Sequence, residues 1–125
     1  MKNKHKILIV EDEEPLLNAL TDKFSREGME VITAKNGQEG LDVALAKKPD
    51  LILLDVIMPK MDGITMLEKL REDKWGENVE VILLTNLTDA DKVSEAVEKG
   101  VRDYLIKSDW KLEDVVKKVK EKLSE

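Results

Sequence analysis

Apolar residues in this chain fall into short continuous runs, and one near the middle organises the rest. Leu51-Ile52-Leu53-Leu54 places four large apolar residues in succession and then stops on Asp55. A run of this kind is typical of a strand covered on both faces, in the middle of a parallel sheet. Similar or more mixed runs predict four further strands, over residues 6–10, 30–34, 79–84 and 103–106.

Between these runs, apolar residues recur every three or four positions, which predicts amphipathic helices. Pro15 suits the first turn of a helix and Gly28 its end. Asn36-Gly37 predicts a turn before the second helix, and Asp62-Gly63 predicts the start of the third. Two more helices are predicted, between Asp89 and Gly100 and over residues 112–123.

Strands and helices alternate strictly, which predicts an α/β fold with a parallel sheet and helices on both faces. The first, third, fourth and fifth strands end on polar reactive residues, and the second does not. Because ligands bind at the carboxyl ends of parallel strands, these four strands belong side by side. The predicted order is 2-1-3-4-5, a doubly wound, flavodoxin-like (βα)5 sandwich of three layers. At 125 residues, the chain is long enough for one domain with its own core.

Composition excludes several function classes. The formal net charge of −6 and the lack of a basic stripe argue against direct nucleic-acid binding. With no cysteine, the chain has neither disulfides nor thiolate sites. No apolar stretch reaches the length of a membrane span, and the basic N-terminus lacks the apolar segment of a signal peptide. We therefore predict a cytoplasmic protein that does not contact the membrane.

Five polar residues are expected to meet at the strand ends: Glu11, Asp12, Asp55, Thr85 and Lys107. Three carboxylates held close together repel one another unless a cation joins them. Because the expected ligand atoms are oxygens, with no His or Cys, the predicted cation is Mg2+. A hard metal, a lysine and a hydroxyl could then bind a phosphoryl group, and Asp55 would be the nucleophile that becomes an acyl phosphate.

Each of these residues alone has a simpler explanation. Acids after a strand often only cap a helix. Asp55 could be a solvated turn residue, Thr85 a cap and Lys107 a surface lysine, while Tyr104 is most simply a half-buried aromatic of the last strand. The expected convergence of four strand ends in one layer is what favours the functional interpretation.

Three other α/β classes fit less well. A dinucleotide-binding fold or a flavin carrier binds phosphate after the first strand, where Glu11-Asp12-Glu13-Glu14 would repel it. A haloacid-dehalogenase-type phosphatase also uses a strand-end Asp with Mg2+. That class needs a second Asp two residues later, where this chain has Ile57.

Five stretches form a set that is specific in combination: Ile9-Val10-Glu11-Asp12-Glu13; Leu53-Leu54-Asp55-Val56-Ile57-Met58-Pro59; Asp62-Gly63; Leu84-Thr85; and Gly100-Val101-Arg102-Asp103-Tyr104-Leu105-Ile106-Lys107. With this set the chain resembles the response-regulator receiver domains of two-component signalling. The resemblance covers essentially the whole chain, so residues 1–125 are expected to form one receiver domain with no output domain.

The resemblance implies a role for each site residue. Asp55 is the expected phosphoacceptor, and Asp12 is expected to bind Mg2+ directly, with Glu11 acting through a water. The other implied roles are a further metal ligand (the Ile57 backbone carbonyl), two groups that hold phosphoryl oxygens (Lys107 and Thr85), and an aromatic switch that turns inward when Thr85 is drawn to the phosphate (Tyr104).

The resemblance also implies partners. A histidine kinase or a histidine phosphotransfer domain would dock at the first helix and donate the phosphoryl group to Asp55. A downstream protein would read the signal on the fourth helix, fifth strand and fifth helix, with the chain a monomer or a weak dimer after phosphorylation. The chain would be no enzyme beyond its own phosphorylation and slow autodephosphorylation. The alternative is a degenerate receiver that binds protein or dimerises without phosphorylation.

The sequence departs from the family pattern in two loops. Ser108 follows Lys107, where the family commonly has a Pro after a cis bond. A cis bond before a non-proline costs about 3 kcal/mol, so a trans bond and a different loop shape are expected. Asn86 follows Thr85, where a small residue is common. The resemblance also implies that the side chains two residues after the phosphoacceptor and two after the threonine flank the path of the hydrolytic water. Here they are Ile57 and Leu87, both apolar, which predicts a long-lived phosphoprotein.

Overall fold

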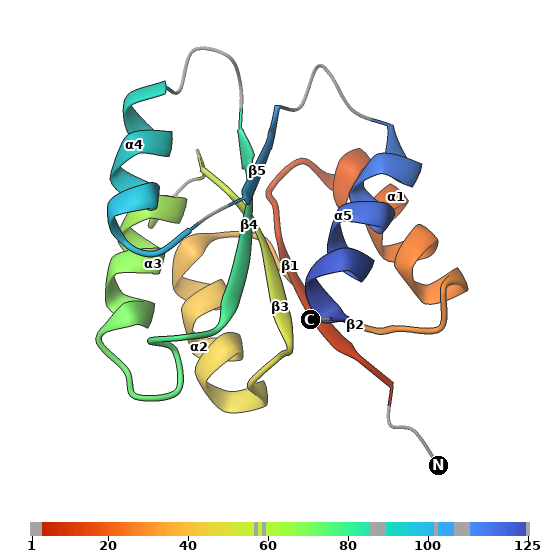
Figure 1. Ribbon diagram of the computed structural model, residues 1–125, viewed down its shortest axis with the longest axis horizontal. Helices are drawn as coiled ribbons and strands as arrows, with labels where there is room; N and C mark the ends of the chain where they lie inside the picture. Colours follow the sequence, from red (N-terminus) through yellow and green to blue (C-terminus); the bar gives the residue numbers. More distant parts are fainter. Residues whose placement is uncertain are drawn as a thin grey trace.

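The computed structural model describes residues 4–56, 58, 60–85, 90–101, 103–106 and 111–124. Strands and helices alternate along it (Figure 1): β1 (Lys6–Val10), α1 (Glu14–Arg26), β2 (Glu30–Ala34), α2 (Gly37–Lys47), β3 (Leu51–Asp55), α3 (Gly63–Arg71), β4 (Glu80–Thr85), α4 (Ala90–Glu98), β5 (Asp103–Ile106) and α5 (Leu112–Leu123). Neighbouring strands pair in parallel, in the order β2-β1-β3-β4-β5. The predicted flavodoxin-like architecture is confirmed.

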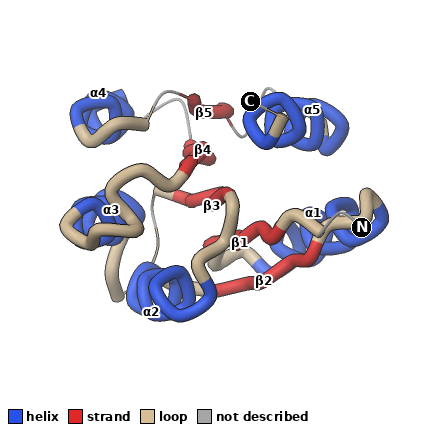
Figure 2. The backbone as a smooth tube through the Cα atoms, turned by 60° about the horizontal axis from the view of Figure 1, so that its bottom comes forward, coloured by secondary structure: helices blue, strands red, loops and turns tan. Residues whose placement is uncertain are grey.

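The sheet separates two apolar cores. Helices α2, α3 and α4 cover one face, and α1 and α5 cover the other (Figures 1 and 2). Because successive residues of a strand point to opposite faces, β3 supplies Ile52 and Leu54 to the first core and Leu51 and Leu53 to the second. All four side chains are fully buried. Because both faces of β3 are covered, its positions before Asp55 are all apolar, which explains the continuous apolar run in the sequence.

The start of α2 corrects one prediction. Asn36-Gly37 is not a turn before the helix, because Asn36 caps α2 and Gly37 is its first residue. The Asn36 side chain accepts a hydrogen bond from the Glu39 backbone N–H at 2.8 Å. This bond satisfies an N–H group that has no acceptor within the helix. Asp62 caps α3 in the same way, as predicted.

A half-buried arginine joins elements that are distant in sequence. Arg71, at the end of α3, donates hydrogen bonds to the backbone carbonyls of Lys99 at 2.9 Å, Gly76 at 2.7 Å and Val79 at 2.9 Å. Burial lowers the pKa of the Arg71 guanidinium, and the charge of Glu80 opposes that shift. Arg71 therefore ties the chain just after α4 to the segment that enters β4.

Asp103, at the start of β5, is held by two lysines of α5. Lys122 Nζ lies 2.7 Å from one carboxylate oxygen, and Lys118 Nζ lies 3.4 Å from the other. Burial raises the pKa of the Asp103 carboxyl, but the two lysines outweigh burial, so the pKa lies below its ordinary value of 3.8. The Asp103 side chain is only 16% exposed, so solvent screens these pairs less than those on the open surface.

We expect Asp103→Asn to lower the free energy of unfolding by about 1 kcal/mol at neutral pH, because both ion pairs are lost. A carboxyl with a lowered folded-state pKa stabilises the protein above its unfolded pKa, and that stabilisation is lost as pH falls through the folded pKa. Urea denaturation should therefore show a gap between wild type and variant that is constant above about pH 5 and closes below about pH 4. The control is Glu113→Gln. Glu113 is exposed and lies 4.0 Å from Lys23, so this ion pair should contribute little, and the variant should unfold like wild type at every pH. A gap that did not depend on pH would contradict the assignment.

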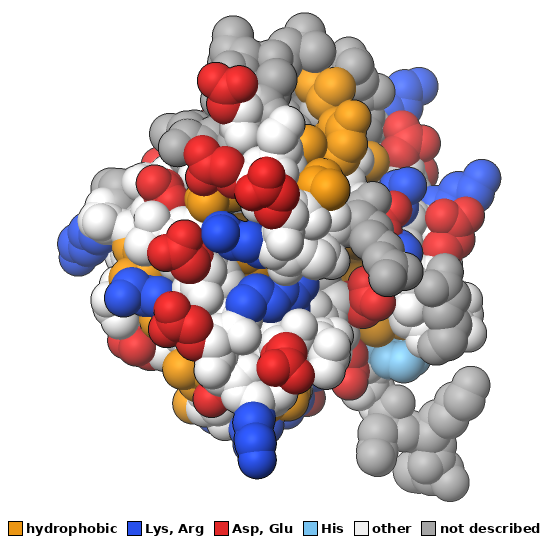
Figure 3. All heavy atoms as spheres, turned by 60° about the vertical axis from the view of Figure 1, so that its left-hand side comes forward, with side chains coloured by type: hydrophobic (Ala, Val, Ile, Leu, Met, Phe, Trp, Pro, Cys, Tyr) orange, Lys and Arg blue, Asp and Glu red, His pale blue; other side chains and the backbone are white. Residues whose placement is uncertain are grey.

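The outer face of α3 and α4 carries charged side chains of both signs, and apolar side chains gather toward one end of that view (Figure 3). Within the described ranges, Val97 on α4 and Tyr104 on β5 are the large apolar residues that are exposed. Among the residues that the structure describes, every helix is too short or too polar to cross a membrane.

Candidate functional site

The carboxyl ends of β1 and β3 bring two acids to one level of the sheet. Val10 pairs with Leu54, so the next residues, Glu11 and Asp55, lie side by side. The Glu11 N–H donates to the Ala34 carbonyl at 3.0 Å, which extends the pairing of β1 with β2 by one residue. Glu11 is fully buried and Asp55 is 3% exposed. Two carboxyl groups are thus held in a largely desolvated position.

Asp12 completes a cluster of three carboxylates. One oxygen from each of Glu11, Asp12 and Asp55 lies within 4.8 Å of the other two. Glu11 Oε2 also accepts a hydrogen bond from the Glu13 N–H at 3.1 Å, which fixes the turn into α1. Asp12 is exposed, so the cluster reaches solvent on its side. Like charges at this separation destabilise one another unless a cation lies among them.

The donor set fits a hard divalent cation. The candidate ligand atoms are all carboxylate oxygens, which suit Mg2+ rather than a softer metal. Mg2+ also retains several waters and needs only one or two carboxylates, which agrees with an exposed acid beside two buried ones. The structure thus brings together the three acids that the sequence placed at strand ends, and metal binding by them stays a prediction.

Thr85 and Tyr104 lie on the two strands beyond β3. Asp55 pairs with Leu84, so Thr85 ends β4 one residue beyond the level of Asp55, and it is buried. Thr85 pairs in turn with Ile106, the last residue of β5. Tyr104 lies two residues earlier, and its side chain is 47% exposed. The hydroxyl predicted to act on a phosphoryl group is therefore at the same edge of the sheet as Asp55.

An ion pair links α1 to the start of the β2–α2 connection. Lys35 Nζ lies 2.8 Å from Glu14 Oε1. This hydrogen bond and the charge attraction lower the pKa of Glu14 and raise that of Lys35. Both side chains are exposed, so the pair adds little stability.

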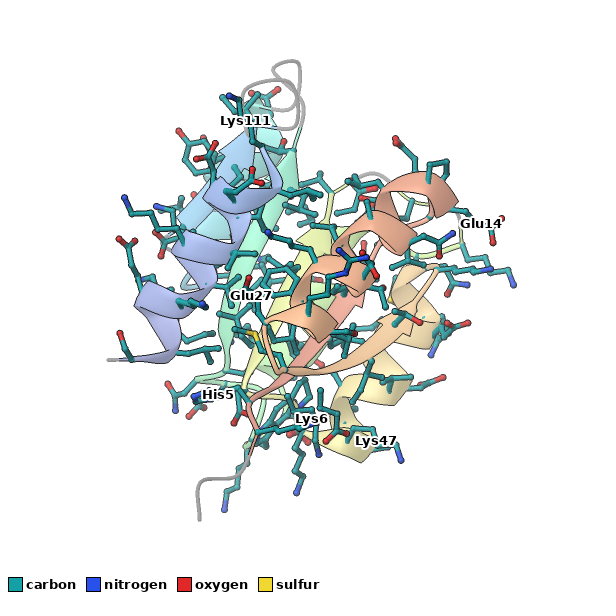
Figure 4. The ribbon with its side chains drawn as sticks, turned by 90° about the vertical axis from the view of Figure 1, so that its right-hand side faces the viewer. His5, Lys6, Glu14, Glu27, Lys47 and Lys111 are labelled. Carbon is teal, nitrogen blue, oxygen red and sulfur yellow. The ribbon has the colours of Figure 1, made fainter. Side chains whose placement is uncertain are left out.

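Figure 4 shows Glu14 at the opposite end of the molecule from His5, Lys6 and Lys47, so His5 is remote from the strand ends that carry the acids.

Several predictions fall on residues that the structure does not describe. Ile57 and Lys107 lie outside the described ranges, as do Asn86, Leu87 and Ser108. The metal role of the Ile57 carbonyl, the phosphate role of Lys107 and the expected trans bond before Ser108 therefore stay predictions.

One site residue was missed as such in the sequence. The Gly63 N–H donates to the Val56 carbonyl at 2.9 Å, and a Cβ on Gly63 would overlap the carbonyl oxygen of Asp55. Gly63 therefore lets the start of α3 approach the backbone of Asp55. Asp62-Gly63 predicted a helix start and belonged to the stretches that resemble the family, but neither signal predicted this close approach to Asp55.

Comparison with protein families gives a match over most of the chain. The family model described as "Response regulator receiver domain" matches residues 7–120. This range includes every predicted site residue.

Curated relatives are similar over four fifths or more of this chain. "Alkaline phosphatase synthesis transcriptional regulatory protein PhoP" of Bacillus subtilis is 43% identical over 102 residues, which are 82% of this chain and 42% of that protein. "Probable transcriptional regulator ycf27" of Cyanophora paradoxa is 40% identical over 106 residues, 84% of this chain and 43% of that protein. "Protein-glutamate methylesterase/protein-glutamine glutaminase" of Archaeoglobus fulgidus is 39% identical over 113 residues, which are 88% of this chain and 32% of that protein. The chain spans less than half the length of these relatives.

Solved structures share the fold over nearly the whole chain. A CheY-like response regulator receiver domain protein from Methanospirillum hungatei superposes with a TM-score of 0.90 at 28% identity, covering 98% of this chain and 95% of that one. The chemotaxis response regulator CheY4 of Vibrio cholerae superposes with a TM-score of 0.88 at 27% identity, covering 96% of this chain and 99% of that one.

Proposed function

Because the chain belongs to the response regulator receiver domain family, we propose that it accepts a phosphoryl group on Asp55 in a Mg2+-dependent reaction. The donor is a phosphohistidine of a histidine kinase or a histidine phosphotransfer domain, and the product state switches a protein-binding surface. The observation that carries this proposal is the approach of Glu11, Asp12 and Asp55 to within 4.8 Å at adjacent strand ends.

In the proposed reaction, a carboxylate oxygen of Asp55 attacks the phosphorus. A P–O bond forms as the P–N bond breaks, and the electron pair of that bond stays on the imidazole nitrogen of the donor. Mg2+, when bound, would offset the charge that builds up on the phosphoryl oxygens. The further proposed metal ligands are Glu11, Asp12 and the Ile57 carbonyl, and the proposed donors to phosphoryl oxygens are Lys107 and Thr85.

Burial supports covalent transfer at Asp55. With Asp55 3% exposed and Glu11 fully buried, a donor group reaches the cluster from the side on which Asp12 is exposed. A carboxylate stripped of most of its water is a better nucleophile than one on the open surface, provided that a cation balances its charge.

The proposed switch runs from Thr85 to Tyr104. A phosphoryl group on Asp55 would attract the Thr85 hydroxyl, and Tyr104 would turn inward in response. This movement would remove one of the exposed apolar side chains from the surface near α4 and β5, where a downstream protein is the proposed reader. The intact cluster favours this function over phosphorylation-independent binding.

The test is NMR of the isotope-labelled protein with Mg2+ and beryllofluoride, a phosphoryl mimic. We expect Mg2+ alone to shift the Asp55 amide, Mg2+ with beryllofluoride to shift Asp55 further together with Thr85 and Tyr104, and Mg2+ binding to be weaker in Asp12→Asn. No further shift at Asp55 when beryllofluoride is added at saturating Mg2+ would reject the phosphoryl site. Shifts at Asp55 and Thr85 without any at Tyr104 would reject the switch alone.

A further inference from the structure

Two helix starts hold the loop that follows Asp55. This loop joins β3 to α3. The Gly63 N–H, at the start of α3, donates to the Val56 carbonyl at 2.9 Å. The Gly37 N–H, at the start of α2, donates to the Met61 carbonyl at 2.9 Å. The loop is therefore attached at its two ends by its own helix and near Met61 by a helix that comes from elsewhere in the chain.

The contact between α2 and the loop requires a residue without a side chain. A Cβ on Gly37 would overlap the Met61 carbonyl oxygen and would lie 2.8 Å from the Met61 carbonyl carbon. Both are backbone atoms, so no side-chain rotation relieves the overlap, and either α2 or the loop would have to move. Gly37 has no unusual backbone angle. Its glycine is required by close approach and not by conformational freedom.

One described residue of the loop has a strained backbone, so the loop benefits from this outside support. Lys60 has a φ of +67°, in the left-handed region. An L-residue with a Cβ costs about 1 kcal/mol or more in this region. Strained conformations of this kind persist only where surrounding contacts determine them, and the hydrogen bond to Met61 next door is such a contact.

Helix α2 is fixed independently of the loop, so it can serve as a support. Asn36 caps the helix through the Glu39 N–H at 2.8 Å. Gly40, one turn along, packs toward the side chains of Val10 and Met66 in the core. Val10 precedes the acids Glu11 and Asp12 directly. The first turn of α2 thus lies against Val10, at the end of β1 just before two of the acids, and against the loop that follows the third acid, Asp55.

We infer that Gly37 is a positioning residue for the acidic cluster: by lacking a side chain, it lets α2 hold the β3–α3 loop where Asp55 and its neighbours bind Mg2+. This inference rests on the proposed function, because it assumes that the cluster binds the metal. Groups that orient metal ligands without touching the metal typically contribute a factor of about ten or more to affinity.

The first test compares Gly37→Ala with Gly76→Ala. Each variant places a Cβ against backbone atoms: at Gly37 it would overlap the Met61 carbonyl oxygen, and at Gly76 it would overlap the Leu70 carbonyl oxygen, in the segment that precedes the amino end of β4. Calorimetry should show Mg2+ affinity lowered about tenfold in Gly37→Ala and unchanged in Gly76→Ala, and urea denaturation should show that both variants lose stability. Equal Mg2+ affinity in wild type and Gly37→Ala would overturn the inference.

The second test uses the unmodified protein, so it does not depend on whether Gly37→Ala folds. Coupling between two sites is reciprocal. If the bond to Met61 supports the metal site, saturating Mg2+ should slow hydrogen exchange of the Gly37 amide by the same factor of about ten. The Gly40 amide, which donates to Asn36 at 2.9 Å, should not change. No selective slowing at Gly37 would also overturn the inference.

The outcomes separate the two proposals. A wild-type protein that does not bind Mg2+ at all would reject the metal role in the proposed function. A wild type that binds Mg2+, with no effect at Gly37 in either test, would reject only the positioning role.

Discussion

Asp55→Asn is expected to abolish uptake of hydroxylamine-labile phosphate from acetyl phosphate and Mg2+, whereas wild type gains one phosphoryl group. An amide is not a nucleophile at neutral pH, and it cannot form an acyl phosphate. Asn has the shape of Asp, so the buried position at the end of β3 is retained. Intact-protein mass spectrometry before and after hydroxylamine measures the result, because an acyl phosphate is cleaved and a serine or threonine ester is not.

The matched control is Asp50→Asn, which changes a carboxylate just before the other end of the same strand. Asp50 is exposed, and its side chain accepts a hydrogen bond from the Lys6 N–H at 2.7 Å. This variant should gain phosphate at the wild-type level. If Asp55→Asn still gained labile phosphate, or if Asp50→Asn lost it, the phosphoacceptor would have to be reassigned.

The sequence predicted the fold because two kinds of signal agreed. The run from Leu51 to Leu54 is apolar at every position because both faces of β3 are covered, and a continuous run is visible without any alignment. The strand order followed from which strands end on polar residues. That argument works because chemistry collects at the carboxyl ends of parallel strands, where Glu11 and Asp55 do lie level in the sheet.

Contacts with backbone atoms that are distant in the sequence left no comparable signal. Arg71 is the third of three charged residues within four positions in the sequence and looks like a surface residue, yet it binds a carbonyl 28 residues away. Gly37 was assigned to a turn because Asn-Gly favours turns. Its true constraint is the Met61 carbonyl, which only the packed structure supplies. Local propensity describes one segment at a time, whereas these residues are determined by a second segment.

The lifetime of the acyl phosphate is the second large effect expected, and it concerns Ile57 and Leu87. Hydrolysis needs a water in line with the bond between phosphorus and Asp55. In the family to which the chain belongs, the side chains two residues after the phosphoacceptor and two after the threonine flank that approach. Neither Ile57 nor Leu87 can hydrogen-bond a water, and their bulk should lower its occupancy. Since positioning a reactant is worth several kcal/mol in favourable cases, hydrolysis should be slower by tens of fold than in a site whose two flanking side chains hydrogen-bond the water.

Replacing both side chains with polar ones should therefore shorten the lifetime. In the double variant Ile57→Asn with Leu87→Glu, phosphate release after phosphorylation by acetyl phosphate is expected to be faster than in wild type by about tenfold or more. The control is Ile57→Val with Leu87→Met, which keeps both positions apolar and should release phosphate at the wild-type rate. Saturating Mg2+ removes any effect on metal affinity from the comparison. Release from the polar variant that was no faster than from the apolar control would mean that these side chains pack against neighbouring loops and do not restrict water, and that the lifetime is determined elsewhere in the site.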